Sequence, residues 1–158
     1  MDPIQNETPR CLSDLRATRV PDDDELILKI VCRACGESGF SFNEVSHGDA
    51  PIGIIFHCVK CGAEDEAFDG IKHGYDGELG HTDHLEGPRS VHELVWADGS
   101  SPRVEGLFAL FTFNIDVSEL QEISSETNVR PVDLFDWFHL STRTPEGRYE
   151  TIWDYECS

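Results

Sequence analysis

The sequence motif Cys-x-x-Cys-Gly occurs twice, and its cysteines are Cys32, Cys35, Cys58 and Cys61. Two cysteines with two residues between them can turn both sulfurs toward one point, and the glycine that follows lets the backbone close a tight turn. Four thiolates form the tetrahedral soft-donor set that Zn²⁺ favours, although iron fits the same cage. The motifs therefore predict one structural zinc ion, with no open coordination position for chemistry.

Short strands must position these cysteines. Residues 26–31 are aliphatic and lead directly into the first motif, while residues 40–45 and 52–56 have the length and composition of two further strands. We expect the strands over residues 27–31 and 52–56 to pair and so bring the two motifs together.

The doubled motif resembles a zinc ribbon, and the resemblance covers about residues 26–70. It implies that the tips of the two cysteine turns present a contact surface to nucleic acid or to another protein. Arg33 and Lys60 lie at those tips. Acidic residues crowd the same segment, so we expect the partner to be a protein.

A second metal site is an alternative place for chemistry. His73, His81, Asp83 and His84 fall in a Gly-, His- and Asp-rich stretch that reads as a long loop ending near His92. Three of these side chains could hold a metal with an open position, which would activate water. The competing interpretation is a solvated loop in which the histidines are incidental.

The rest of the chain predicts a small body of strands and helices. Residues 91–96 read as a strand and residues 105–117 as a long strand or a bent pair of strands. Residues 107–111 are apolar on both faces, which indicates a central buried strand. A helix should begin at Asp116 or Ser118, and a second helix should open at Pro131.

The C-terminal segment adds two further expectations. A Pro-Glu-Gly turn after the second helix should lead into a last strand whose aromatic residues share one face with Thr151; they are Tyr149, Trp153 and Tyr155. The pair of helices has the apolar spacing of a helix-turn-helix, but the second would carry one arginine against two aspartates.

The predicted fold class is therefore α+β: a zinc-ribbon β-module packed on or inserted in a small antiparallel sheet with two C-terminal helices. The predicted divisions are a flexible acidic arm, the zinc ribbon, a Gly/His/Asp-rich loop and a small α+β body; they cover residues 1–25, 26–70, 71–90 and 91–158.

Charge limits the partners. The 158 residues carry 31 acidic and 12 basic side chains, for a net charge of −19. Such a field repels phosphate backbones and anionic lipid, unless the charge is an adaptation to a salt-rich medium. The sequence has no apolar run of 18 residues or more that would span a membrane, and its N-terminus lacks a secretory pattern, so we expect a cytoplasmic protein.

Three functions fit these patterns. The leading hypothesis is a zinc-stapled acidic interaction protein that docks on a protein partner, in one variant as a mimic of nucleic acid. The second is a metal-dependent enzyme that uses an open site in residues 73–92. The third is a nucleic-acid-binding transcriptional regulator. No nucleophile elbow, phosphate loop or dinucleotide motif supports an enzyme.

Overall fold

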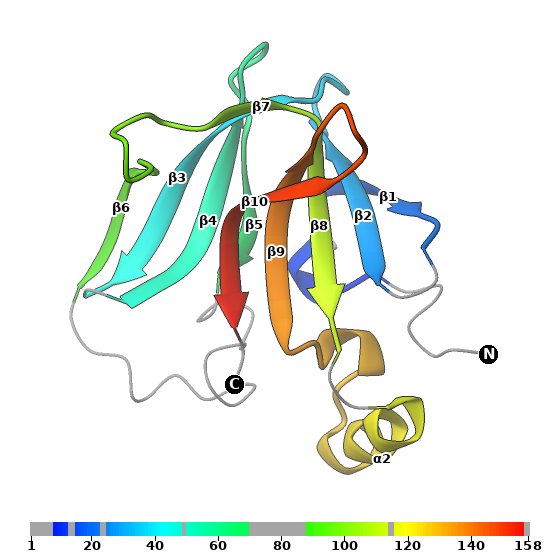
Figure 1. Cartoon of the computed structure of the whole chain (residues 1–158). Helices are drawn as coiled ribbons and strands as arrows, with labels where there is room; N and C mark the ends of the chain where they lie inside the picture. Colours follow the sequence, from blue (N-terminus) through cyan, green and yellow to red (C-terminus); the bar gives the residue numbers. More distant parts are fainter. Residues whose placement is uncertain are drawn as a thin grey trace.

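The computed structural model describes residues 8–12, 15–22, 25–48, 50–69, 88–113 and 116–156. Within them the chain forms two antiparallel sheets that pack face to face, with one α-helix at the lower end (Figure 1). No helix in these ranges is long and apolar enough to cross a membrane.

The first sheet, called sheet A, has the strand order β1-β2-β8-β9-β10. Its strands are β1 (Arg16–Val20), β2 (Leu26–Val31), β8 (Leu107–Thr112), β9 (Trp137–Arg143) and β10 (Tyr149–Glu156). The second, sheet B, has the order β5-β4-β3-β6, with β7 pairing on β3 beyond the end of β6. Its strands are β3 (Gly39–His47), β4 (Ala50–Cys58), β5 (Glu64–Asp69), β6 (Arg89–Glu93) and β7 (Arg103–Glu105).

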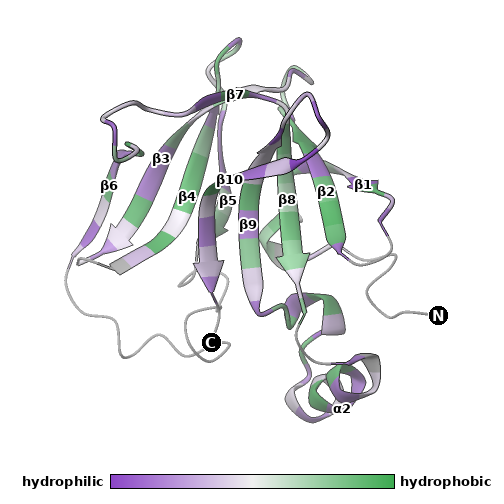
Figure 2. Cartoon of the chain, in the orientation of Figure 1, coloured by the Kyte–Doolittle hydropathy of each residue, from purple (hydrophilic) through white to green (hydrophobic). Residues whose placement is uncertain are grey.

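The main core lies between the sheets. On β2 the inward side chains alternate, since Leu26, Leu28 and Ile30 belong to the main core. Figure 2 shows green, hydrophobic bands along the strands of both sheets. Phe68 on β5 is its aromatic centre, because the rings of Phe135, Phe138, Trp153 and Tyr155 lie within 6.4 Å of its centroid. The two sheets are therefore joined by one continuous apolar layer.

Strand β8 is buried on both faces, which confirms the predicted central strand over residues 107–111. Leu107, Ala109 and Phe111 face the core between the sheets, whereas Phe108 and Leu110 form a second apolar cluster with Ile27, Val20 and Tyr149 on the outer face of sheet A. Burial on both faces explains why this strand shows no polar alternation.

Helix α2 (Val117–Thr127) begins where the sequence predicts a helix. Its N-cap is Asp116, whose side chain accepts a hydrogen bond from the amide of Glu119. The helix ends at Asn128, which adopts φ 59° and donates its amide to the carbonyl of Ser124.

The predicted second helix at Pro131 is wrong. A single 3-10 turn, η2 (Pro131–Asp133), is followed by strand β9, which lies between β8 and β10. Phe138 and Leu140 enter the core while Trp137 and His139 point to the other face, so the period is two. The apolar spacing fitted a helix locally, but pairing on both sides of β9 decides its conformation. With one helix in the described chain, the pair that a helix-turn-helix needs is missing.

Two smaller expectations also fail. A β-bulge between Thr151 and Trp153 reverses the alternation of β10, so that Tyr149 packs on the outer face while Trp153 and Tyr155 pack on Phe68 in the core. The strands leading into the two cysteine motifs do not pair with each other: β2 pairs with β1 and β8, and β4 pairs with β3 and β5.

Candidate metal centre

The two cysteine turns meet at one end of the sandwich. The first joins β2 of sheet A to β3 of sheet B, and the second is the tip of the β4–β5 hairpin. Both lie at the top of Figure 1, above the end of the core. An ion bound between them would therefore tie the crossover between the sheets to an edge hairpin of sheet B.

Both turns have the same backbone geometry. Gly36 and Gly62 each adopt φ 78°, in the left-handed region that favours glycine. The amide of each glycine donates to the carbonyl of the cysteine four residues earlier, at 2.8 Å onto Cys32 and 2.9 Å onto Cys58. The amides of these two cysteines donate to the carbonyl of the residue just after the glycine, Glu37 in the first turn and Ala63 in the second, at 2.9 Å in both turns. The repeated Cys-x-x-Cys-Gly motif thus folds twice into one local structure.

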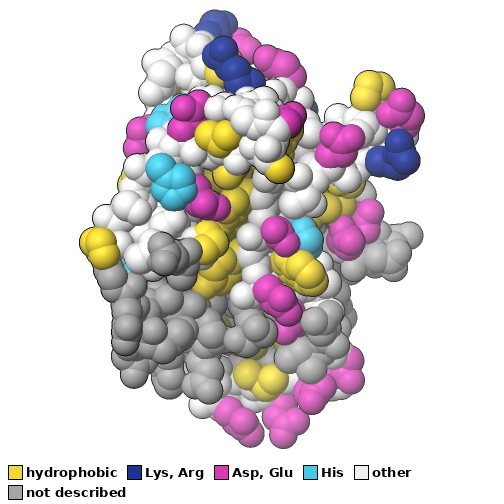
Figure 3. Space-filling view, turned by 60° about the vertical axis from the view of Figure 1, so that its left-hand side comes forward, with side chains coloured by type: hydrophobic (Ala, Val, Ile, Leu, Met, Phe, Trp, Pro, Cys, Tyr) yellow, Lys and Arg dark blue, Asp and Glu magenta, His cyan; other side chains and the backbone are white. Residues whose placement is uncertain are grey.

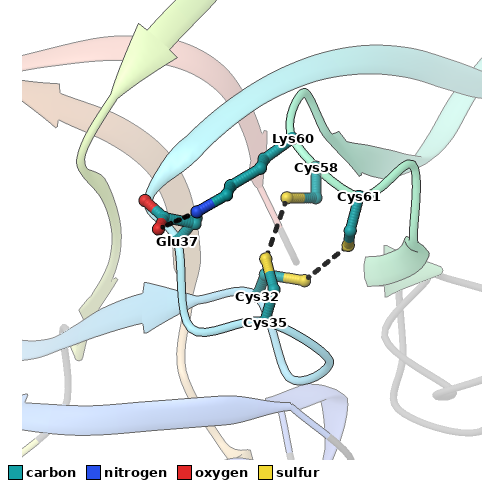
Figure 4. Close-up of polar contacts among 6 residues, drawn as sticks. All are labelled: Cys32, Cys35, Glu37, Cys58, Lys60 and Cys61. Carbon is teal, nitrogen blue, oxygen red and sulfur yellow. Dashed lines mark hydrogen bonds and ion pairs between the residues drawn. The ribbon is translucent and has the colours of Figure 1, made fainter.

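The structure brings the four sulfurs together. Those of Cys32, Cys35, Cys58 and Cys61 all lie within 4.8 Å of one another, and two contacts across the turns, Cys32 to Cys61 and Cys35 to Cys58, measure 3.5 Å (Figure 4). All four are free cysteines. A tetrahedral ion bonded at about 2.3 Å to each sulfur would set neighbouring sulfurs about 3.8 Å apart, so the donor set fits a metal ion.

Burial divides the four cysteines into two roles. Cys32 and Cys58 are 1% and 2% exposed and belong to the main core, whereas Cys35 and Cys61 are exposed. Next to Cys58, Phe40 packs edge-on against Phe56 at 5.0 Å between ring centroids. The first cysteine of each turn therefore fixes the cluster to the core, and the second faces solvent.

Electrostatics favours a bound cation. The Cys61 amide, together with that of Lys60, lowers the pKa of the Cys58 thiol to about 7. The Glu37 amide acts in the same direction on Cys35, but desolvation and the three neighbouring sulfurs outweigh it and raise the pKa of that thiol to about 12. Four thiolates this close repel one another, and a divalent cation would offset that repulsion.

The two basic residues predicted as a contact surface are paired within the molecule. Lys60 on the second turn lies 2.8 Å from Glu37, which follows the first turn (Figure 4). Arg33 on the first turn lies 2.6 Å from Asp65, which follows the second turn. The two ion pairs are reciprocal, and they neutralise the positive charge that phosphate contacts would need. The sequence shows that acidic residues lie near the two turns, but only the fold shows which of them pairs with Arg33 and which with Lys60.

The histidine-rich alternative falls mostly outside the structure described. His73, His81, Asp83 and His84 lie outside the described residues. His92, at the end of that stretch, lies on β6, where its Nε2 is 3.2 Å from Oε1 of Glu44. In the described chain, the four cysteines form the one cluster of three or more ligating side chains with metal-site spacing.

Comparisons with protein-family models, with curated proteins and with solved structures found no match to this chain. The geometry of its own residues therefore carries the functional argument.

Proposed function

We propose that this chain is a zinc-stapled acidic interaction protein that docks on a basic segment of a protein partner along strand β6. Zinc follows from the donor set, because four thiolates at tetrahedral spacing suit this ion better than the oxygen-seeking cations. A filled sulfur cage leaves no position for water, so the ion holds the two turns together and performs no chemistry.

The observation that carries the proposal is the outer edge of β6. The amide of Leu94 donates to the carbonyl of Phe42 on β3, and the amide of Gly48 donates to the carbonyl of Pro88. Hydrogen bonding alternates along an antiparallel pair, so Ser90 and His92 point their backbone groups toward β3. Val91 and Glu93 therefore point theirs outward, where the described chain supplies no further strand.

Exposed apolar side chains gather beside this edge. Val91, Val95 and Trp96 are 51%, 52% and 45% exposed. Of the large hydrophobic residues exposed in the described chain, the remaining one is Val59. An open strand edge with neighbouring apolar side chains is the surface on which an extended segment adds as another strand.

The acidic surface beside β6 favours a basic partner segment. Glu93 on β6 and Asp98 in the following turn are exposed, and the whole chain carries a net charge of −19. Figure 3 shows Asp and Glu side chains scattered over the visible face, with Lys and Arg at its upper end and at its right-hand side. Arg89, the basic residue on β6 itself, lies 4.0 Å from Glu66. An extended segment rich in Lys and Arg matches this field. If the partner uses the same segment for nucleic acid, the acidic surface acts as a competitor for it.

The zinc proposal is tested by elemental analysis of the purified chain. We expect one zinc ion per chain, lost in Cys58→Ser together with much of the stability, because metal binding contributes folding free energy in such sites. Cys11→Ala is the matched control, since Cys11 is buried outside the cluster. Iron in the native protein, or a Cys58→Ser variant with unchanged thermal midpoint, would contradict the proposal.

The docking proposal is tested in two steps. A photo-crosslinking residue at Val95 should capture a protein through a basic segment, whereas the same residue at Glu122 on helix α2 should not. A synthetic peptide of the captured segment is then titrated into the purified chain by calorimetry.

Val91→Pro is the decisive variant in that titration. The Val91 amide points away from β3, so proline removes an outward donor and no bond of the sheet. We expect the Kd for the peptide to rise roughly tenfold or more with the thermal midpoint nearly unchanged. His92→Pro, which removes a bond to β3, should instead destabilise the fold. Equal binding by Val91→Pro, or crosslinks to nucleic acid, would refute docking on β6.

A further inference from the structure

The outer face of sheet A carries a pocket of about 280 Å³ that has no part in the metal centre or in β6. Strand registers define its position. Leu110 lies opposite His139, and Ser141 lies between Phe108 and Thr151. The pocket thus lies over the last part of β8, the middle of β9 and the start of β10, on the side of sheet A that faces away from sheet B.

A buried hydroxyl group without a partner lies in this pocket. Ser141 is 1% exposed and lines the pocket, and its Oγ has no hydrogen-bond partner in the structure described. A buried polar group of this kind is destabilising, and the few that occur in folded proteins call for an explanation. Because Oγ is itself covered in this structure, a ligand would supply the missing hydrogen bond after a small movement of the side chains that cover it.

The remaining lining is rich in groups that both donate and accept hydrogen bonds. Thr112, Thr151 and Tyr149 add three more hydroxyls, and His139 adds an imidazole. The His139 ring stacks on Trp137 at 5.1 Å between centroids and 22° between planes, which holds it in place. The Trp137 indole is fixed in turn, because its Nε1 donates to Asp154 at 2.8 Å.

Charge and size narrow the ligand class. Glu25 is the one charged side chain among the lining residues, and Asp154 lies opposite His139 on the same face. The Arg143 guanidinium lies 5.5 Å from the centroid of the Tyr149 ring, so charges of both signs border the pocket and favour a neutral ligand over an ion. The volume lies just below the usual range for drug-sized molecules, so the ligand is small. Leu110 offers an apolar surface of the kind that packs on the C–H face of a sugar.

We infer that this pocket binds a small neutral polyhydroxylated ligand, a single sugar ring, with Ser141 Oγ hydrogen-bonded to one of its hydroxyls. The sugar comes either free or as the end of a glycan. This inference does not rest on the proposed docking along β6, since no residue is shared between the two sites.

The test is an NMR titration of the ¹⁵N-labelled full chain with the methyl α-pyranosides of glucose, galactose and mannose. We expect shifts confined to the strands of the pocket for at least one of them, with a Kd in the millimolar range. A glycan array then separates the sources: binding to glycan ends supports a glycan, and binding to monosaccharide alone supports a free sugar.

Two variants decide the role of Ser141. Ser141→Ala should weaken binding about tenfold while leaving the thermal midpoint unchanged or raised, because the variant removes an unpaired hydroxyl. Thr151→Val, on the rim, should weaken binding less, and Thr18→Val on β1 of the same face should have no effect.

Several outcomes would overturn the inference. One is the absence of any shift with all three sugars. Another is a loss of stability in Ser141→Ala, which would mean that the hydroxyl is satisfied inside the protein. A third is a titration in which tetramethylammonium chloride, and none of the sugars, moves the same signals, since that would assign the pocket to a cation held by Glu25.

Discussion

The indole Nε1 of Trp153 donates a hydrogen bond of 2.6 Å to Oε2 of Glu44, and this bond joins β10 of sheet A to β3 of sheet B. Trp153 is 6% exposed, and the other oxygen of Glu44 lies 3.2 Å from His92. One carboxylate therefore ties the edge of one sheet to two strands of the other.

Replacement of Glu44 should show how much its hydrogen bond to Trp153 contributes to stability. Glu44→Ala leaves the Trp153 indole buried without an acceptor, and we expect a loss of about 1–3 kcal/mol in the free energy of unfolding, measured with urea. Glu44→Gln keeps an acceptor oxygen and should lose less. If both variants unfold at the wild-type urea concentration, the bond has no role in holding the sheets together.

The glycines of the two cysteine turns provide a matched pair. A methyl group at Gly62 would meet nothing within 4 Å, so Gly62→Ala tests the φ of 78° alone. At Gly36 the methyl would also lie 3.2 Å from Nη1 of Arg16. We expect thermal unfolding of the zinc-bound protein to show a loss of about 1–2 kcal/mol for Gly62→Ala, and slightly more for Gly36→Ala.

Gly62→Asn is the control for this pair, because asparagine tolerates left-handed backbone better than alanine does. Its loss should be smaller than that of Gly62→Ala. A Gly62→Ala variant as stable as the wild type would show that the turn does not need this backbone conformation.

The ion pair between Lys60 and Glu37 should contribute little. Both side chains are largely exposed, and water and salt screen such pairs. We expect Lys60→Ala to lower the thermal midpoint by about 1–3 °C in low salt, with the difference vanishing in 1 M NaCl. A double-mutant cycle with Glu37→Ala isolates the pair. A large, salt-independent effect would instead mean that Lys60 acts on the sulfur cluster itself.

The cap of helix α2 predicts a dependence on pH. The Glu119 amide, and then the Ser118 hydroxyl, lower the pKa of Asp116 below its ordinary value of 3.8. A carboxyl whose pKa is lower in the folded state stabilises the fold above its ordinary pKa, and the stabilisation disappears as the pH falls through the folded value.

The measurement compares the wild type with Asp116→Asn, which keeps an acceptor oxygen but does not titrate. The difference between their thermal midpoints should favour the wild type at pH 6 and shrink below about pH 4. Asp116→Ala should be lower than both at pH 6, by roughly 2–4 °C. A difference that stays constant with pH would rule out this role for the carboxylate.

Local patterns in the sequence predict the parts of this structure that depend on neighbouring residues. The start of helix α2, the buried strand over residues 107–111 and the grouping of four cysteines follow from spacing and residue type. Such local patterns mislead where a helix and a strand would bury the same apolar residues. Residues 131–140 fit an amphipathic helix, yet β9 forms there because β8 and β10 offer it partners on both sides.

For the functional surfaces too, the sequence determined some features and the tertiary structure determined others. Sequence alone determined the four-cysteine donor set and the acidic charge, because ligand chemistry and net charge belong to residue types. Only the tertiary structure decided that Lys60 meets Glu37, that a bulge in β10 separates Tyr149 from Trp153, and that Ser141 is buried in a pocket. These relationships join residues distant in the chain, and strand register, which is set by packing of the whole sandwich, fixes them.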